Sequence, residues 1–178
     1  MYSEAYLDFL IYFHSDRDYF ECHEVLEEHW KEQSTKSRHS HWVGLIQIAV
    51  GLYHHRRGNV SGAWRMYDKA ISVISKEHQS ISALGLDVPK LLDQLKAQQV
   101  LLETSPLTFV DMDLPITDEA LLQACQKHCQ QLRKQWMTKK EVPEHIIHKH
   151  FLRDRSDIVK ERARQLTLRK QNKEEEND

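Results

Sequence analysis

The feature that most constrains the fold of this chain is an apolar segment near residue 50 that has no polar face. Residues 43–53 read VGLIQIAVGLY, in which Gln47 is the one strongly polar side chain. A membrane-spanning helix needs about 20 apolar residues, so this segment is too short to cross a bilayer. A helix that is apolar nearly all round must be covered by other elements. We therefore predict an all-α fold, a multi-helical bundle around a buried central helix over about residues 41–57.

The rest of the chain supplies the helices that cover this segment. Five glycines and four prolines in 178 residues leave few turn signals, which favours long helices over many short strands. Apolar spacing predicts helices over residues 3–14, from a cap at Ser15 or Asp16 to residue 33, over residues 60–78, and after caps at Asp87 and Thr117. Residues 106–117 hold two prolines and are predicted to form an extended strap across the bundle.

Charge is distributed unevenly along the chain. Residues 1–30 contain eight acids and one base, whereas residues 133–170 contain twelve Lys or Arg and five acids. We predict a helical bundle domain over residues 1–137, a basic helical extension over residues 138–171 and a disordered tail over residues 172–178. The basic extension can contact a protein or nucleic acid. Alternatively, it lies against the acidic N-terminal helices of its own domain or of a second subunit, which leaves a homodimer open.

Cysteine usage indicates the compartment. Cys22, Cys125 and Cys129 form an odd set, and the chain has no secretory leader. We therefore expect a reduced, cytoplasmic protein with no membrane association.

The second helix places ionisable side chains in its apolar stripe. At about 100° per residue, one side of this helix carries Tyr19, Cys22, Leu26 and Trp30. His23 and Glu27 are four residues apart and fall within the same arc. A histidine and a carboxylate in an apolar interface cost free energy unless something pairs with them. These two side chains are therefore the first candidates for a functional site.

One face of the central helix carries small and polar residues. Gly44, Gln47, Gly51 and His54 are spaced three, four and three residues apart, so they line one side of the helix. The two glycines permit another helix to approach closely. If that helix is the second one, four polar side chains converge in the interior. The helical angle favours His54 over His55 for this face.

Two interpretations of the convergent side chains remain open. In the functional one, His23, Glu27 and His54 bind a divalent metal such as zinc, manganese or iron, with Gln47 nearby, or they bind a small ligand or handle a proton. In the structural one, the same groups form a hydrogen-bond network that fixes how two helices cross. The chain lacks the His-Glu-x-x-His motif, and it has no Glu-x-x-His. The sequence names no reaction, and whether the protein is an enzyme stays open.

Two segments resemble a known family. Residues 20–30 (FECHEVLEEHW) and residues 44–54 (GLIQIAVGLYH), followed by RGN at 57–59, resemble the small all-helical family DUF309, a domain of unknown function, over about residues 6–75. The family pattern falls on Phe20, His23, Glu24, Glu27, Trp30, Gln47, His54, Gly58 and Asn59. The resemblance implies a multi-helical bundle and adds Glu24 to the candidate ligands, but it supplies no activity. We assign structural roles to Trp30, Gly44, Gly51, Gly58 and Asn59, of which Asn59 is placed to cap the helix over residues 60–78.

Two functions of different classes follow from this sequence. The first is a metal- or ligand-binding site built from His23, Glu24, Glu27, Gln47 and His54. The second is an interaction module in which residues 138–171 bind a protein or nucleic acid and the polar cluster is purely structural.

Overall fold

The computed structural model describes residues 2–33, 40–137 and 141–152. The chain divides into a first unit, residues 1–147, and a second unit, residues 148–178. This division falls later than the predicted domain boundary at residue 137. Most of the predicted basic extension and the whole predicted tail lie outside the described residues.

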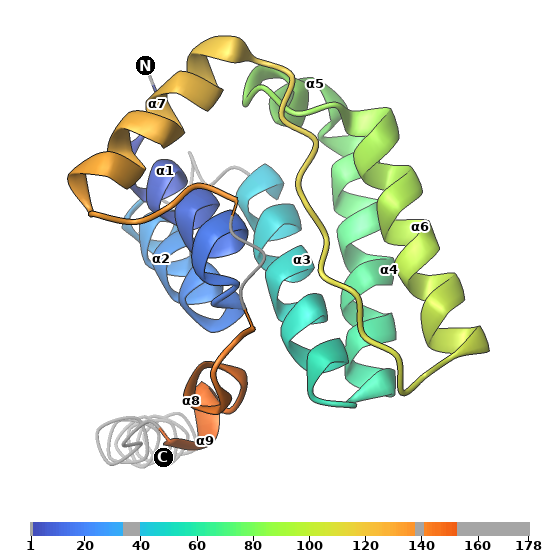
Figure 1. Cartoon of the computed structure of the whole chain (residues 1–178). Coiled ribbons are helices and arrows are strands. Elements are labelled where there is room, and N and C mark those ends of the chain that lie inside the picture. Colours follow the sequence, from blue (N-terminus) through green and yellow to red (C-terminus); the bar gives the residue numbers. More distant parts are fainter. Residues whose placement is uncertain (1, 34–39, 138–140, 153–178) are drawn as a thin grey trace, which may run out of the picture. The chain divides into compact units, whose positions relative to one another are not determined.

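Helices make up the regular structure of the first unit, as predicted (Figure 1). Its elements are α1 (Glu4–Ile11), the π-helical turn η1 (Tyr12–Asp16), α2 (Tyr19–Glu32), α3 (Ser40–Arg56), α4 (Val60–Lys76), α5 (His78–Ala83), α6 (Val88–Thr104), α7 (Glu119–Gln131) and α8 (Glu144–Ile147). The second unit contributes α9 (Lys149–Leu152). An isolated antiparallel bridge joins Leu86 to Ile116. None of the described helices is long and apolar enough to span a membrane.

The helix caps show where local sequence signals were sufficient. Asn59 accepts a hydrogen bond from the Gly62 amide at the start of α4, and Asp87 caps α6, both as predicted. The predicted cap at Ser15 or Asp16 is wrong, because these residues continue the first helix as the π-helical turn. Asp18 caps α2 instead. The carboxylate of Asp118, rather than the hydroxyl of Thr117, caps α7.

Helix α3 occupies the middle of the first unit, between α1 and α2 on one side and α4 and α6 on the other (Figure 1). Its fully buried residues are Leu45, Ile48, Ala49 and Leu52. The central position is therefore confirmed. Val43, Ile46, Gln47 and Val50, on the remaining side of the helix, are partly buried.

The two helical glycines of α3 face α4 rather than α2. A Cβ atom added to Gly51 would lie 2.6 Å from Cε1 of Tyr67, and one added to Gly44 would lie 3.1 Å from Cγ1 of Ile74. The prediction that these glycines permit a close helix approach is confirmed, but the neighbouring helix is not the one that carries His23 and Glu27.

The predicted strap is present as an irregular segment between α6 and α7 that crosses the bundle (Figure 1). Side-chain amides hold its backbone, since Gln98 donates to the Val110 carbonyl and Gln94 donates to the Asp113 carbonyl, both at 3.0 Å. The strap thereby brings residues 108–113 against η1, the start of α2 and the end of α3.

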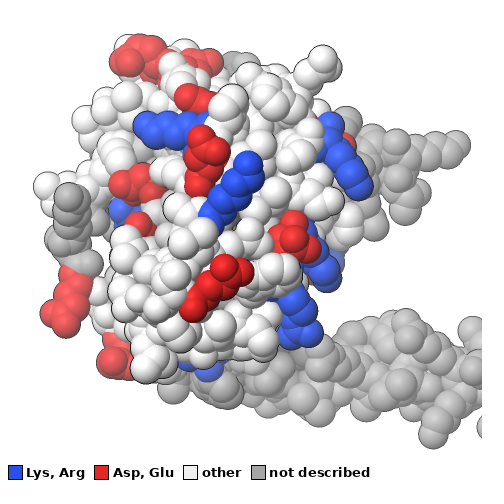
Figure 2. Space-filling model, turned by 90° about the vertical axis from the view of Figure 1, so that its right-hand side faces the viewer, with Lys and Arg blue, Asp and Glu red and all other residues white. Residues whose placement is uncertain are grey.

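Acidic and basic side chains alternate on the face that α6 presents (Figure 2). On this face, the described residues form no large patch of a single sign. Near the C-terminal end of α7, Lys134 pairs with Asp16 at 2.5 Å and His128 pairs with Asp8 at 2.8 Å. Both bases precede the predicted extension, so the interpretation that residues 138–171 lie against the acidic N-terminal helices stays a prediction. The predicted contact of residues 138–171 with a protein or nucleic acid stays a prediction.

Candidate functional site

Helix α2 carries the candidate site at the edge of its buried stripe. Tyr19, Cys22 and Leu26 have no solvent exposure, which confirms the predicted stripe, and Trp30 is partly buried against the same core. The side chains of His23 and Glu27 are 28% and 33% exposed. They therefore lie beside the buried stripe rather than within it, and the predicted interior location of these groups is wrong.

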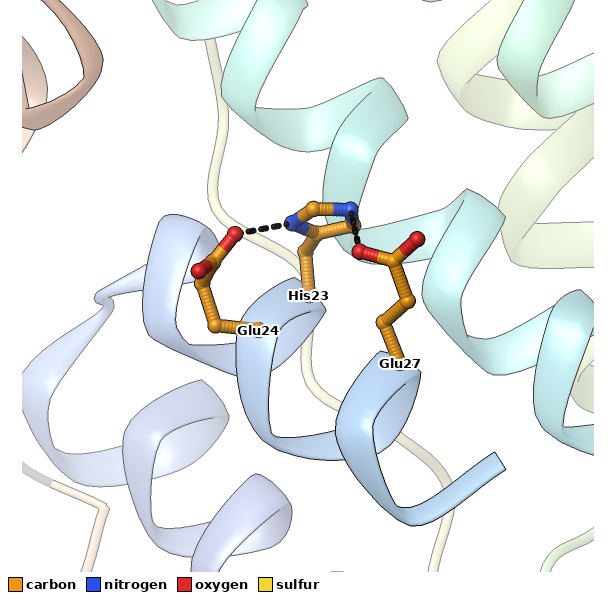
Figure 3. A group of neighbouring side chains, drawn as sticks. All are labelled: His23, Glu24 and Glu27. Carbon is orange, nitrogen blue, oxygen red and sulfur yellow. Dashed lines mark ion pairs between the residues drawn. The ribbon is translucent and has the colours of Figure 1, made fainter. Parts of the chain in front are cut away.

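The imidazole of His23 lies between two carboxylates of the same helix (Figure 3). Its Nδ1 atom is 3.1 Å from Oε1 of Glu24, and its Nε2 atom is 3.1 Å from Oε2 of Glu27. Lys31 binds the other oxygen of Glu27 at 2.9 Å. The spacing of four explains the pairs that Glu27 forms with His23 and Lys31, because residues four apart lie on the same side of a helix, whereas Glu24 is the immediate neighbour of His23.

Three ligand atoms, one each from His23, Glu24 and Glu27, lie within 4.8 Å of one another. An imidazole nitrogen and two carboxylate oxygens form a donor set that suits zinc, manganese or iron. Each ring nitrogen faces a different carboxylate. One nitrogen can therefore bind an ion together with one glutamate, while the other nitrogen donates its hydrogen to the second glutamate, an arrangement that commonly orients metal-binding histidines.

His54 does not complete this cluster. It lies in the last turn of α3, is partly exposed, and has its Nδ1 atom 3.1 Å from Nδ2 of Asn59. Among the described residues, it is not part of the group whose ligand atoms lie within 4.8 Å. The expected meeting of His54 with His23 and Glu27 is therefore not found.

Gln47 lies half-way along α3, and the oxygen of its side-chain amide is a buried hydrogen-bond acceptor. Its Oε1 atom has no hydrogen-bond partner within the described part of the chain. A buried amide oxygen without a partner costs free energy, so a group that binds it stabilises the protein.

His55, which by helical angle does not share the face of Gln47, is the buried histidine at the end of α3. Its Nδ1 atom lies 3.3 Å from the Tyr67 hydroxyl, and its Nε2 atom lies 3.0 Å from the Thr108 carbonyl. Burial lowers the pKa of His55. The strap covers this side of α3. The spacing of residues along one helix does not show which other segment covers each side.

A second polar cluster, formed by His14, Arg17 and Asp113, was not found from the sequence. His14 has no solvent exposure, and its Nδ1 atom is 3.4 Å from Oδ1 of Asp113. Arg17 binds the same oxygen at 2.6 Å and donates to the Met112 carbonyl at 3.0 Å. His14 and Arg17 hold the pKa of the Asp113 carboxyl well below its usual range. The partners lie on distant segments, so no local spacing reveals the cluster.

Comparisons with known proteins agree with the resemblance at the N-terminal half. The model of a family described as domain of unknown function, DUF309, matches residues 6–66, a range that includes all five candidate site residues. The chain is 42% identical over 175 residues to "Uncharacterized protein YpuF" of Bacillus subtilis (strain 168), an alignment that covers 98% of this chain and 100% of that protein. No solved structure matches the chain.

Proposed function

We propose that this chain, which belongs to the DUF309 family, binds a divalent metal ion through His23, Glu24 and Glu27 on α2. The observation that supports the proposal is the convergence of one imidazole nitrogen and two carboxylate oxygens within 4.8 Å. The ions that fit this donor set are zinc, manganese and iron.

The spacing of the ligand atoms supports this assignment. Two ligands of a tetrahedral ion with metal–ligand bonds of about 2.1 Å lie about 3.4 Å apart. The Nε2 atom of His23 and the Oε2 atom of Glu27 are 3.1 Å apart, which is close to that spacing. Helix α2 is anchored by its buried stripe, so the backbone that carries both ligands is held in place before an ion arrives.

The cluster is partly exposed, so it is accessible to an ion from solvent. His23, Glu24 and Glu27 are each about one-third exposed, so an ion and its water ligands can reach them. When one ring nitrogen and one carboxylate bind the ion and the second carboxylate orients the imidazole, coordination positions remain for water or a substrate oxygen. An ion bound in this way can polarise a carbonyl or phosphoryl oxygen or activate water.

The competing interpretation is an ion-pair network that only stabilises α2. The two interpretations differ in what they require of Glu27. A network of hydrogen bonds tolerates an amide at this position with a loss of about 1–2 kcal/mol. A metal site needs the charge, so Glu27→Gln removes ion binding while the fold persists.

The experiment uses the full-length chain purified without a histidine tag. We expect isothermal titration with Zn²⁺ and Mn²⁺ to give about one bound ion and thermal melts to show a rise in Tm on ion addition. Glu27→Gln is expected to lose both responses. Glu28→Gln is the matched control, because Glu28 is exposed on the same helix. Absence of binding in the wild type, or equal binding by the Glu27 variant, contradicts the proposal.

A further inference from the structure

A cavity of about 530 Å³ lies in the first unit, away from the His23 cluster. Three chain segments line it, namely residues 15–17, residues 133–135 and residues 141–146. Its volume is within the range of small-molecule sites, about 300–1,000 Å³. None of the metal-site residues proposed above lines this cavity.

The backbone around the cavity is unusual. Ser15 and Asp16 belong to the π-helical turn η1, and Arg17 follows with a φ of 53°. Arg133, on the second segment, has a φ of 54°. Non-glycine residues with positive φ number three in the described part of the chain, and two of them line this cavity. Strained backbone and π-helical turns both concentrate at ligand sites.

Most charges that line the cavity are neutralised by other side chains. The Arg17 guanidinium binds Asp113 at 2.6 Å and two backbone carbonyls. The Lys134 ammonium binds Asp16 at 2.5 Å and lies 4.7 Å from the centre of the Tyr12 ring. These cations are satisfied within the protein and are not free to bind a ligand.

Two opposite charges at the cavity remain unpaired. Arg133 and Glu141 are both exposed, and neither side chain has an ion-pair or hydrogen-bond partner among the described residues. Val142 and Ile146 also line the cavity, and they are partly buried apolar residues. The cavity therefore offers one cation, one anion and an apolar wall.

We propose that this cavity binds a small zwitterion with a carboxylate at one end and an ammonium at the other. Arg133 binds the carboxylate, for which a guanidinium offers two parallel N–H donors. Glu141 binds the ammonium, and the carbon chain of the ligand packs against Val142 and Ile146. A singly charged molecule leaves one of the two protein charges without a partner and binds more weakly.

The test is isothermal titration of the full-length chain with a series of amino acids whose two charges are increasingly far apart. The series is glycine, β-alanine, γ-aminobutyrate and ε-aminocaproate, and the controls are carboxylates and amines of the same lengths. We expect one length to bind best, and to bind at least about tenfold more tightly than its singly charged controls. The absence of binding by every member at millimolar concentration, or equal binding by the controls, overturns the proposal.

Substitutions locate the binding. Arg133→Gln and Glu141→Gln are each expected to weaken binding of the best zwitterion by about tenfold or more. Both side chains are exposed, so these variants are expected to fold, which circular dichroism checks. The controls Lys96→Gln and Glu4→Gln remove exposed charges elsewhere and should bind as the wild type does. Full binding by both cavity variants overturns the assignment. Adding a chelator leaves this binding unchanged, which separates it from the metal site.

Discussion

Gly51 of α3 and Tyr67 of α4 are packed so closely that a Cβ atom on Gly51 would lie 2.6 Å from the ring of Tyr67. Tyr67 is fully buried, and its hydroxyl lies 3.3 Å from Nδ1 of His55, which restricts how far the ring can move. This contact fixes the distance between α3 and α4. The position of α3 in turn determines which of its side chains face α2.

Gly51→Ala is expected to destabilise the protein by about 1–3 kcal/mol, because the added methyl group overlaps a buried ring. Urea unfolding followed by circular dichroism measures the change. Gly44→Ala is the comparison, since its added Cβ would lie 3.1 Å from a side-chain carbon of Ile74. There the gain in helix propensity, about 0.5–1 kcal/mol, offsets much of the strain. Equal effects of the two substitutions contradict this account of the α3–α4 contact.

His14 is expected to make stability depend on pH in the neutral to mildly acidic range. Burial lowers the pKa of His14 below its usual 6.5, and Asp113 opposes this only in part. The unfolded chain therefore takes up a proton at a higher pH than the native state. The stabilisation is present above about pH 6.5 and is lost as the pH falls through the lower pKa of the folded state.

His14→Phe removes this titration while keeping an aromatic ring between Phe13 and Trp136. We expect the wild type to lose more stability than the variant between pH 7.5 and pH 5, as measured by urea unfolding at each pH. Parallel pH profiles for the two proteins show that His14 does not carry the effect.

Arg56 is expected to stabilise the turn between η1 and α2. Its Nη2 atom donates to the Arg17 carbonyl at 2.6 Å, and its guanidinium lies 4.4 Å from the centre of the Tyr19 ring. A lysine cannot reproduce both the planar stacking and the hydrogen bond. Arg56→Lys should therefore cost about 1–2 kcal/mol in urea unfolding. Arg65→Lys, an exposed change on α4, should cost much less. A similar cost for both variants contradicts this role for Arg56.

The parts of the fold that could be predicted depend on local signals. Three predictions that depend on residues close together in sequence are confirmed. They are the helix formed by the apolar residues of α3, the cap at Asn59 and the buried stripe of α2. Glycines at positions 44 and 51 predicted a close helix contact, but spacing within one helix does not say which neighbour makes it. That choice depends on the packing of the whole bundle.

The errors at the candidate site arise from elements that are distant in sequence. Helical angle places His54 on the same face as Gln47, but His54 is not part of the group that His23, Glu24 and Glu27 form. The π-helical turn shifts the start of α2 and places His14 against Asp113, which no periodicity in residues 1–30 indicates. His23 and Glu27 could be found from their spacing on one helix, whereas Glu24, which completes the group, was added by the resemblance to the family.

Removal of Lys31 tests whether the cluster is a metal site or a stabilising network. A network loses an ion pair, whereas a metal site loses a competing positive charge. Its ammonium binds Oε1 of Glu27 at 2.9 Å, while Oε2 of the same carboxylate faces His23. In a network, Lys31 contributes a favourable ion pair. At a metal site, it places a positive charge near the incoming ion and competes for Glu27. Lys31→Met should therefore raise the affinity for Zn²⁺.

The expected gain is about three- to tenfold, the effect of removing one partly solvated charge at a distance of several ångströms. Isothermal titration of the wild type and Lys31→Met at two salt concentrations measures it, and higher salt should reduce the difference because exposed charges are screened. Lys69→Met, an exposed change on α4, is the control for loss of a positive charge far from the site. Weaker Zn²⁺ binding by Lys31→Met than by this control means that Lys31 supports the cluster instead of competing with the ion.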